Sequence, residues 1–141
     1  MSEEAGRPIL LVEDDEPLAA VIARHLRARG HEVRVVPSVE DARALLPAAV
    51  RPSLVILDIN LPGETGWSLL RGPEYDAAGR PPVVVVTATH VRSSWLREFE
   101  VAGYLPKPFA LETLVEIVER TVRAQQPLSG GVAGDGGIDL E

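Results

Sequence analysis

Residues 54–63 read Leu-Val-Ile-Leu-Asp-Ile-Asn-Leu-Pro-Gly. Four apolar residues run directly into a carboxylate, and a Pro-Gly turn signal follows, which predicts a short buried strand ending at Asp58. Similar apolar runs occupy residues 9–12 and 83–86, with a weaker one at residues 104–105. Residues 31–36 instead alternate Val33 and Val35 with polar residues, which is typical of an edge strand with one solvent-facing side. The chain therefore contains five candidate strands.

Segments with helical periodicity lie between these strands. Pro17 is placed to open a first helix and Gly30 to close it. Ser38 is a candidate N-cap for a second helix, which Pro47 ends or kinks. Residues 111–124 form the most regular helical segment. The apolar face predicted for the first helix consists of Leu18, Val21, Ile22 and Leu26. The apolar face predicted for the last helix consists of Leu111, Leu114, Val115, Val118 and Val122. Its polar residues are expected to face away; they are Glu112, Glu116, Glu119 and Arg123.

Alternation of strands and helices predicts βαβ units and therefore an α/β fold, a doubly wound five-stranded parallel sheet with helices on both faces. At 141 residues the chain has the length of one domain. We expect that domain at residues 7–125, after a flexible N-terminus at 1–6. Residues 126–141 are rich in glycine and lack periodicity, so we expect a flexible tail or linker there.

Composition narrows the function further. The chain is 45% hydrophobic and 25% charged, contains no cysteine and carries a net charge of −7. Thiolate metal sites and cysteine nucleophiles are thereby excluded. The arginines are scattered, so we expect no direct contact with nucleic acid and no membrane-surface binding. The apolar runs are too short to span a membrane and no export signal is recognisable, so we expect a cytoplasmic protein.

Polar groups follow four of the predicted strands. Glu13 and Asp14 follow the strand at residues 9–12, and Asp58 follows the strand that begins at Leu54. Thr87 follows the strand at 83–86, and Lys107, which is the single lysine, follows the strand at 104–105. The carboxyl ends of parallel strands share one edge of a sheet, where ligands bind, so we expect these groups to converge. Crowded carboxylates resist ionisation unless a cation joins them, and Mg²⁺ prefers such oxygen ligands. An aspartate beside this ion can attack phosphorus.

Each group also has a simpler explanation. The acidic pair after a strand can be a helix-start signal, Asp58 a capping residue, Thr87 a strand-end hydroxyl and Lys107 a solvated surface lysine. The occurrence of all of them at four successive strand ends favours a joint chemical role.

Four segments, taken together, resemble the receiver domains of two-component systems. They are Ile9-Leu-Leu-Val-Glu-Asp-Asp15, Leu54-Val-Ile-Leu-Asp-Ile-Asn-Leu-Pro-Gly63, Val83-Val-Val-Val-Thr-Ala88 and Gly103-Tyr-Leu-Pro-Lys-Pro-Phe109. The resemblance implies a flavodoxin-like strand order of 2-1-3-4-5. It also implies a signalling domain that is not an enzyme in the ordinary sense, because it catalyses only its own phosphorylation and dephosphorylation.

The resemblance assigns the site residues. Asp58 is then the phosphoacceptor, and Glu13 and Asp14 form the acidic pocket. Mg²⁺, with Mn²⁺ as an alternative, is held by Asp14, Asp58 and the backbone carbonyl of Asn60. Thr87 and Lys107 contact the phosphoryl group, and the Lys107–Pro108 peptide bond is expected to be cis.

The resemblance also implies partners and a switch. A histidine kinase or phosphotransfer protein donates the phosphoryl group, after which Thr87 and Tyr104 shift. The face made by the family's fourth helix, fifth strand and fifth helix then changes its binding to a downstream effector, to an output domain outside this chain, or to a second copy in a homodimer. Tyr104 has the alternative role of a half-buried core tyrosine. Asn60 and Thr89 are placed to tune the lifetime of the acyl phosphate.

Two segments depart from the family pattern. Gly72-Pro73 interrupts the third helix, and the stretch from Thr87 to Lys107 is short, so the helix within it is expected to be short or reoriented. Its large apolar residues form either core packing, which we favour, or an exposed docking patch; they are Trp95, Leu96 and Phe99.

Other functions remain as alternatives. A haloacid-dehalogenase-like phosphatase needs a second aspartate two positions after its nucleophile, where this chain has Asn60. A flavodoxin-like FMN carrier needs a hydroxyl- and glycine-rich loop after the first strand, where this chain has acidic residues. The alternative closest to a receiver is a receiver-like interaction domain that works without phosphorylation.

Overall fold

The computed structural model describes residues 7–46 and 51–125. Five strands form one parallel sheet in the order β2-β1-β3-β4-β5. The strands are β1 (Ile9–Val12), β2 (Val33–Val36), β3 (Leu54–Asp58), β4 (Val83–Thr87) and β5 (Gly103–Pro106). The predicted α/β fold and strand order are thus confirmed. The expectations for residues 1–6, for Pro47 and for residues 126–141 lie outside the described residues.

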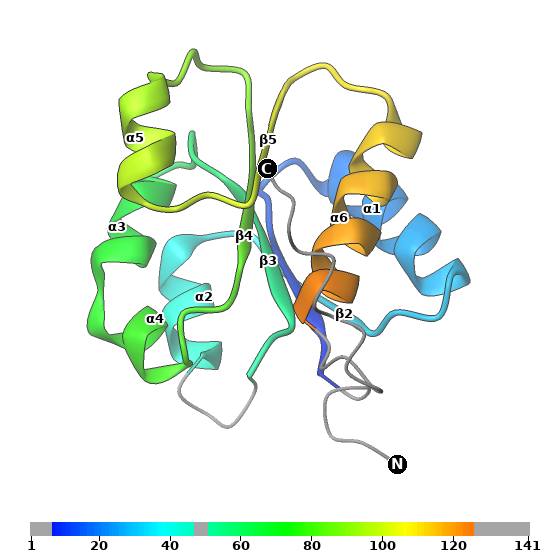
Figure 1. Ribbon diagram of the computed structural model, residues 1–141, viewed down its shortest axis with the longest axis horizontal. Coiled ribbons are helices and arrows are strands. Elements are labelled where there is room, and N and C mark those ends of the chain that lie inside the picture. Colours follow the sequence, from blue (N-terminus) through cyan, green and yellow to red (C-terminus); the bar gives the residue numbers. More distant parts are fainter. Residues whose placement is uncertain (1–6, 47–50, 126–141) are drawn as a thin grey trace, which may run out of the picture.

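Helices cover both faces of the sheet (Figure 1). They are α1 (Glu16–Ala28), α2 (Val39–Leu45), α3 (Gly66–Arg71), α4 (Pro73–Ala77), α5 (Ser93–Glu98) and α6 (Leu111–Gln125). The third predicted helix is broken into α3 and α4 at Gly72, because Pro73 lacks the N–H needed to continue a helix and disfavours helical backbone at the residue before it. The family's fourth and fifth helices therefore correspond to α5 and α6 here.

Two separate apolar cores lie on the two faces of the sheet. One packs α1 and α6 against Leu11, Ile56 and Val84, and the other packs α2 to α5 against Leu10, Leu57 and Val85. These strand residues alternate between the two cores because successive side chains of a strand point to opposite faces. The three central strands are buried throughout, as expected for a parallel sheet covered on both sides.

The helix boundaries follow from local signals. Asp15 is the N-cap of α1, where its side chain accepts a hydrogen bond from the Leu18 N–H at 3.0 Å. Ser38 caps α2 in the predicted way, accepting from the Asp41 N–H at 3.1 Å. The predicted stripe of α6 is confirmed, with Leu114, Val115 and Val118 buried. No helix in the described ranges is long and apolar enough to cross a membrane.

Three predictions of exposure were wrong. Val21 of α1 is 37% exposed, because α1 contacts the sheet through a face shifted by one residue that includes Ala19 and Ala23. Val35 is 41% exposed on the edge strand β2. Glu119 does not simply face away, because its side chain is only 19% exposed and pairs with Arg29, the C-cap residue of α1, at 2.8 Å.

Candidate functional site

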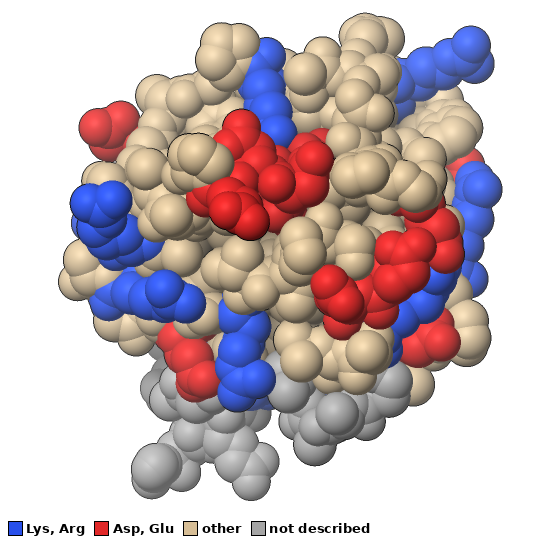
Figure 2. Space-filling model, turned by 180° about the vertical axis from the view of Figure 1, so that it is seen from behind, with Lys and Arg blue, Asp and Glu red and all other residues tan. Residues whose placement is uncertain are grey.

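The predicted polar groups meet at the carboxyl edge of the sheet. Glu13 follows β1, Asp58 ends β3 and Thr87 ends β4, and all three are buried. Figure 2, which shows the molecule from behind, has a group of acidic side chains in its upper half, at the height where the carboxyl ends of the strands lie in Figure 1. Basic side chains are scattered around the rim of that view, as the sequence predicted.

Lys107 links two of the carboxylates. Its Nζ lies 2.9 Å from Asp58 Oδ2 and 3.2 Å from Glu13 Oε2, and it donates a hydrogen bond to each. Lys107 reaches the site from the loop after β5, where the Lys107–Pro108 peptide bond is cis, as the resemblance implied. The solvated-lysine explanation is therefore wrong, because this ammonium is held between two buried carboxylates.

Backbone donors fix the two central side chains. The Asn60 N–H donates to Asp58 Oδ1 at 2.9 Å, and the Thr89 N–H donates to Thr87 Oγ1 at 3.2 Å. Each is a turn in which a strand-end side chain accepts from the residue two positions later. The same local geometry thus orients the two residues that follow the central strands β3 and β4.

Glu13 is the most strongly enclosed carboxylate of the site. Burial raises its pKa, although hydrogen bonds from the Asp15 N–H and from Lys107 act in the opposite direction. For Lys107, burial disfavours the charged form, but the hydrogen bonds to Asp58 and Glu13 outweigh it and the pKa of Lys107 is raised. The lysine is therefore a permanent cation within an acidic pocket.

The donor set fits a hard divalent cation. Glu13, Asp14 and Asp58 each offer one carboxylate oxygen, and these three oxygens lie within 4.8 Å of one another. Glu13 Oε1 is buried and has no hydrogen-bond partner among the described residues, but it is in an ion pair with Lys107, whose Nζ lies 3.1 Å away. Asp14 is exposed and gives the cluster an open side. Oxygen ligands with room for water are what Mg²⁺ prefers.

Comparison with known proteins identifies this arrangement. The family model described as the response regulator receiver domain matches residues 9–119. The chain belongs to the response regulator receiver family. Receiver domains are signalling domains of two-component systems, so this chain is a signalling module rather than an ordinary enzyme.

Individual relatives agree with this assignment. The response regulator protein FleR of Pseudomonas aeruginosa is 37% identical over 94% of this chain and 28% of its own length. The uncharacterized transcriptional regulatory protein YvcP of Bacillus subtilis is 33% identical over 82% of this chain and 48% of its length. The non-phosphorylated HemR receiver domain of Leptospira biflexa superimposes with a TM-score of 0.75 at 31% identity, covering 86% and 98% of the two chains. The receiver spans about half or less of the length of these two curated relatives.

Around the site, the remaining candidates fall into different positions. Tyr104 on β5 is half-buried and packs against the core beneath α2 to α5, and Asn60 and Thr89 are exposed beside Asp58 and Thr87. Phe99 is buried and Trp95 and Leu96 are half-buried against the same core, which confirms core packing for them. His31 contacts Glu119 at 3.1 Å, whereas His25 and His90 are exposed.

Sequence reasoning missed two features of the receiver. The contact between Lys107 and Glu13 joins residues 94 positions apart, and no local pattern reports it. A pocket lined by arginines at the opposite edge of the sheet was also missed, since its residues come from four separate segments. A signal existed only in the clustering of arginine with proline before three of the strands, β1, β3 and β4.

Proposed function

We propose that Asp58 accepts a phosphoryl group from a phosphohistidine of a histidine kinase or of a phosphotransfer protein, in a Mg²⁺-dependent reaction. The observation that carries this proposal is the joint placement of the Asp58 carboxylate against the Lys107 ammonium, at 2.9 Å, and within the cluster of carboxylates. A structural ion pair would not need two further carboxylates beside it.

The chemistry assigns one task to each residue. A carboxylate oxygen of Asp58 attacks phosphorus, the P–N bond to the donor histidine breaks, and the imidazole leaves with the electron pair of that bond. Lys107 then pairs with a phosphoryl oxygen, to which it is a compact cationic donor. The Thr87 hydroxyl donates to another phosphoryl oxygen. The product is an acyl phosphate on Asp58.

Asp14, Asp58 and the backbone carbonyl of Asn60 would hold Mg²⁺, with Glu13 completing the acidic pocket and Mn²⁺ as an alternative ion. When bound, the ion neutralises negative charge that builds up between the carboxylates and the phosphoryl oxygens. Glu13 keeps Lys107 in place from the other side, since Nζ donates to both carboxylates. Loss of either support is expected to slow phosphorylation.

The proposed output is a population shift at the face made by α5, β5 and α6. Thr87 Oγ1 is held by the Thr89 N–H at 3.2 Å, and the hydroxyl of Thr87 is free to turn its proton to a phosphoryl oxygen. Tyr104 stands on the neighbouring strand, with Val85 as its partner in register on β4. Movement of Thr87 and Tyr104 would then alter contacts of α5 with an effector, an output domain or a second copy. Cytoplasmic location is part of this proposal.

Intact-mass spectrometry after incubation with acetyl phosphate tests the acceptor. We expect the mass of one added phosphoryl group with Mg²⁺, none with EDTA, and none in Asp58→Asn. Asp76→Asn is the matched control, because Asp76 is an exposed aspartate on α4 that pairs only with Arg80 in the described structure. Mg²⁺-dependent addition that persists in Asp58→Asn would overturn the assignment.

The second candidate is a receiver-like interaction domain that works without phosphorylation. It is favoured by the ion pairs that already join Lys107 to Asp58 and Glu13, which hold these three side chains in a defined arrangement. Absence of phosphorylation by acetyl phosphate and by a panel of histidine kinases, with partner binding retained in Asp58→Asn, would favour this candidate.

A further inference from the structure

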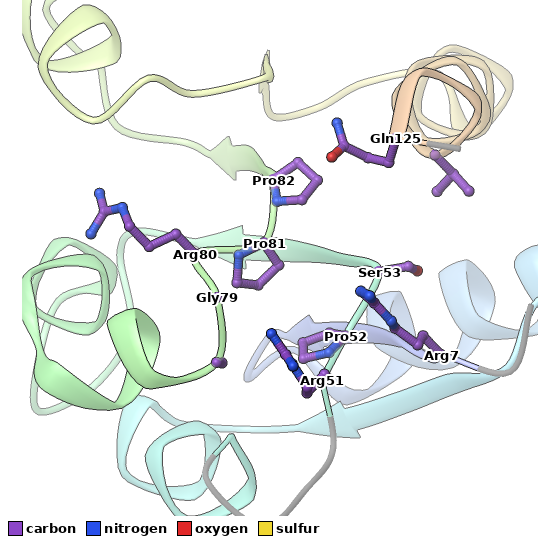
Figure 3. A pocket seen from close by; sticks show the side chains of 11 residues that line it. Arg7, Arg51, Pro52, Ser53, Gly79, Arg80, Pro81, Pro82 and Gln125 are labelled. Carbon is purple, nitrogen blue, oxygen red and sulfur yellow. The ribbon is translucent and has the colours of Figure 1, made fainter. Parts of the chain in front are cut away.

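A pocket of about 260 Å³ lies at the amino edge of the sheet, away from Asp58 (Figure 3). Its walls come from the segments that lead into β1, β3 and β4 and from the end of α6. Strand β3 runs from this pocket, which it leaves at Ser53, to the phosphoacceptor Asp58. The lining residues are Arg7, Arg51, Pro52, Ser53, Ala78, Gly79, Arg80, Pro81, Pro82, Val122 and Gln125.

The lining is rich in hydrogen-bond donors and basic. It includes three arginines and neither aspartate nor glutamate, although the chain as a whole has a net charge of −7. Arg80 is already engaged, because it pairs with Asp76 and lies 5.0 Å from the centre of the Tyr75 ring. Arg7 and Arg51 have no ion-pair partner within residues 7–46 and 51–125. As far as residues 7–46 and 51–125 are concerned, these two guanidinium groups can therefore take an incoming anion.

Figure 3 shows how these side chains lie. Arg7 and Arg51 flank Pro52 and Ser53, whereas the Arg80 side chain extends away from them. Across the pocket lie Pro81 and Pro82, with Gln125 of α6 on the remaining side. Val122 of α6 also lines the pocket. We call Pro81 and Pro82 the proline wall. Planar guanidinium groups beside apolar rings suit a ligand with an anionic group and an apolar part.

The pocket is held in shape by its backbone. The Ser53 N–H donates to the Pro8 carbonyl at 2.8 Å, and the Val55 N–H donates to the Pro82 carbonyl at 2.9 Å. The Tyr75 hydroxyl donates to the Pro81 carbonyl. Since these backbone walls are fixed before any ligand arrives, the ordering cost of binding is confined to the arginine side chains.

Gly79 fits this pocket on two counts. Its φ is +88°, a conformation that L side chains rarely adopt, and a Cβ built there would lie 2.8 Å from Nη2 of Arg51. A side chain at residue 79 would therefore press on the end of the Arg51 side chain, which would have to shift.

We propose that this pocket binds a small organic anion, with its phosphate or carboxylate group on Arg7 and Arg51 and its apolar part against the proline wall. The proposal is independent of phosphorylation at Asp58, because the two sites lie at opposite ends of the same strands.

Titration of the full chain with phenylphosphonate, in metal-free buffer at low salt, tests the proposal by ¹H–¹⁵N NMR and calorimetry. We expect saturable shifts at the amides of Ser53 and Gly79. Binding should weaken about tenfold or more in Arg51→Gln, since a charge-assisted hydrogen bond is lost. Arg120→Gln is the matched control, an exposed arginine on α6 that does not line the pocket, and it should change affinity less than about twofold.

Further comparisons separate the parts of the proposal. Inorganic phosphate should bind more weakly than phenylphosphonate, and the neutral benzyl alcohol should give no saturable shifts. Equal losses in Arg51→Gln and Arg120→Gln, or shifts confined to Asp58 and Lys107, would overturn the pocket as the site. Unchanged affinity in Asp58→Asn is expected and separates this test from that of the phosphoacceptor.

The anionic group can come from a free ligand or from the chain's own sequence after Gln125, which contains Asp135, Asp139 and Glu141 and no lysine or arginine. The combined variant Asp135→Asn, Asp139→Asn, Glu141→Gln distinguishes the two. Binding by this variant but not by the wild type would support an anion site whose natural occupant is those carboxylates. Failure of both proteins to bind phenylphosphonate would overturn the proposal.

Discussion

The two faces of the sheet are built in different ways. Long regular helices, α1 with 13 residues and α6 with 15, cover one face, and an ion pair between Arg29 and Glu119 joins them. The other face is covered by α2 to α5, none longer than 7 residues. Short helices are marginal by themselves and depend on tertiary packing. The first face therefore serves as scaffold, and the second is where rearrangement costs least.

An aromatic cluster holds the second face together. Trp67 of α3 stacks on Phe99 at 4.8 Å between ring centres and meets Trp95 edge-on at 5.2 Å. The Arg71 guanidinium lies 5.1 Å from the Phe99 ring centre and 5.6 Å from that of Trp95. Since α5 contains no buried residue of its own, these contacts fix its position. A switch that moves α5 would then have to rearrange only a few aromatic contacts.

The largest effect is expected on the scaffold face. Leu114 of α6 is fully buried, so Leu114→Ala should lower the free energy of unfolding by about 3 kcal/mol, through lost burial and the cavity left behind. Urea denaturation measures the change. Val122→Ala, at a half-buried position of the same helix, is the control and should cost about 1 kcal/mol. A loss below about 1 kcal/mol in Leu114→Ala would mean that α6 is not the scaffold described above.

Two glycines of the second face differ in how closely their surroundings are packed. A Cβ at Gly66 would lie 2.8 Å from the Asp58 carbonyl oxygen, so Gly66→Ala should cost about 2 kcal/mol by overpacking. It should also slow phosphorylation, because the backbone at Asp58 must move. Gly72 has φ −87° and ψ 160°, which alanine adopts freely, and the only tight contact of a Cβ there would be with the end of the flexible Glu74 side chain, at 3.1 Å, so Gly72→Ala should cost less than about 0.5 kcal/mol. Equal costs in the two variants, measured by urea denaturation, would contradict this explanation.

Loss of one aromatic ring should loosen α5 selectively. Trp67→Leu removes two aromatic pairs, together about 1–3 kcal/mol, while retaining apolar volume. Native-state hydrogen exchange should accelerate at least about fivefold at the amides of Trp95 and Phe99. Exchange in α6 of the same sample is the internal control. Uniform acceleration in α5 and α6 would show that the two faces unfold together, which would contradict the distinction between a scaffold face and a face that rearranges more easily.

The smallest effect is expected for the ion pair between α1 and α6. The hydrogen bond from Arg29 lowers the pKa of Glu119 from 4.5 to about 2. Because the folded pKa is the lower one, the stabilisation is fully present above pH 4.5 and is lost as the pH falls through about 2. Glu119→Gln should therefore cost about 1 kcal/mol at pH 7, the range of partly exposed pairs, and almost nothing near pH 2.

Thermal unfolding at both pH values measures this effect. Glu116→Gln, at an exposed glutamate on the same helix, is the control and should show no such pH dependence. A Glu119→Gln cost that is the same near pH 2 and at pH 7 would assign the effect to packing rather than to charge.

Local sequence signals predicted some elements much better than others. Ser38 and Pro73 act within a single turn, so the cap of α2 and the break before α4 were predictable from neighbouring residues. The buried face of α1 was mispredicted by one residue, because alanines at 19 and 23 allow a close approach that a hydrophobicity pattern favours less than valine. Which of two adjacent faces of a helix becomes buried depends on the surface of the sheet against which the helix packs.

For the candidate site, the sequence by itself determined the membership of the receiver family and the residue types at the carboxyl edge, because parallel strands bring their ends to one line. Only the tertiary structure decided that Lys107 bridges Asp58 and Glu13, and that Arg7 and Arg51 share a pocket at the other edge. The physical reason is the separation along the chain over which each kind of interaction acts. Strand and cap signals act over a few residues, whereas charge pairs and pockets join distant segments whose distances exist only once the sheet has formed.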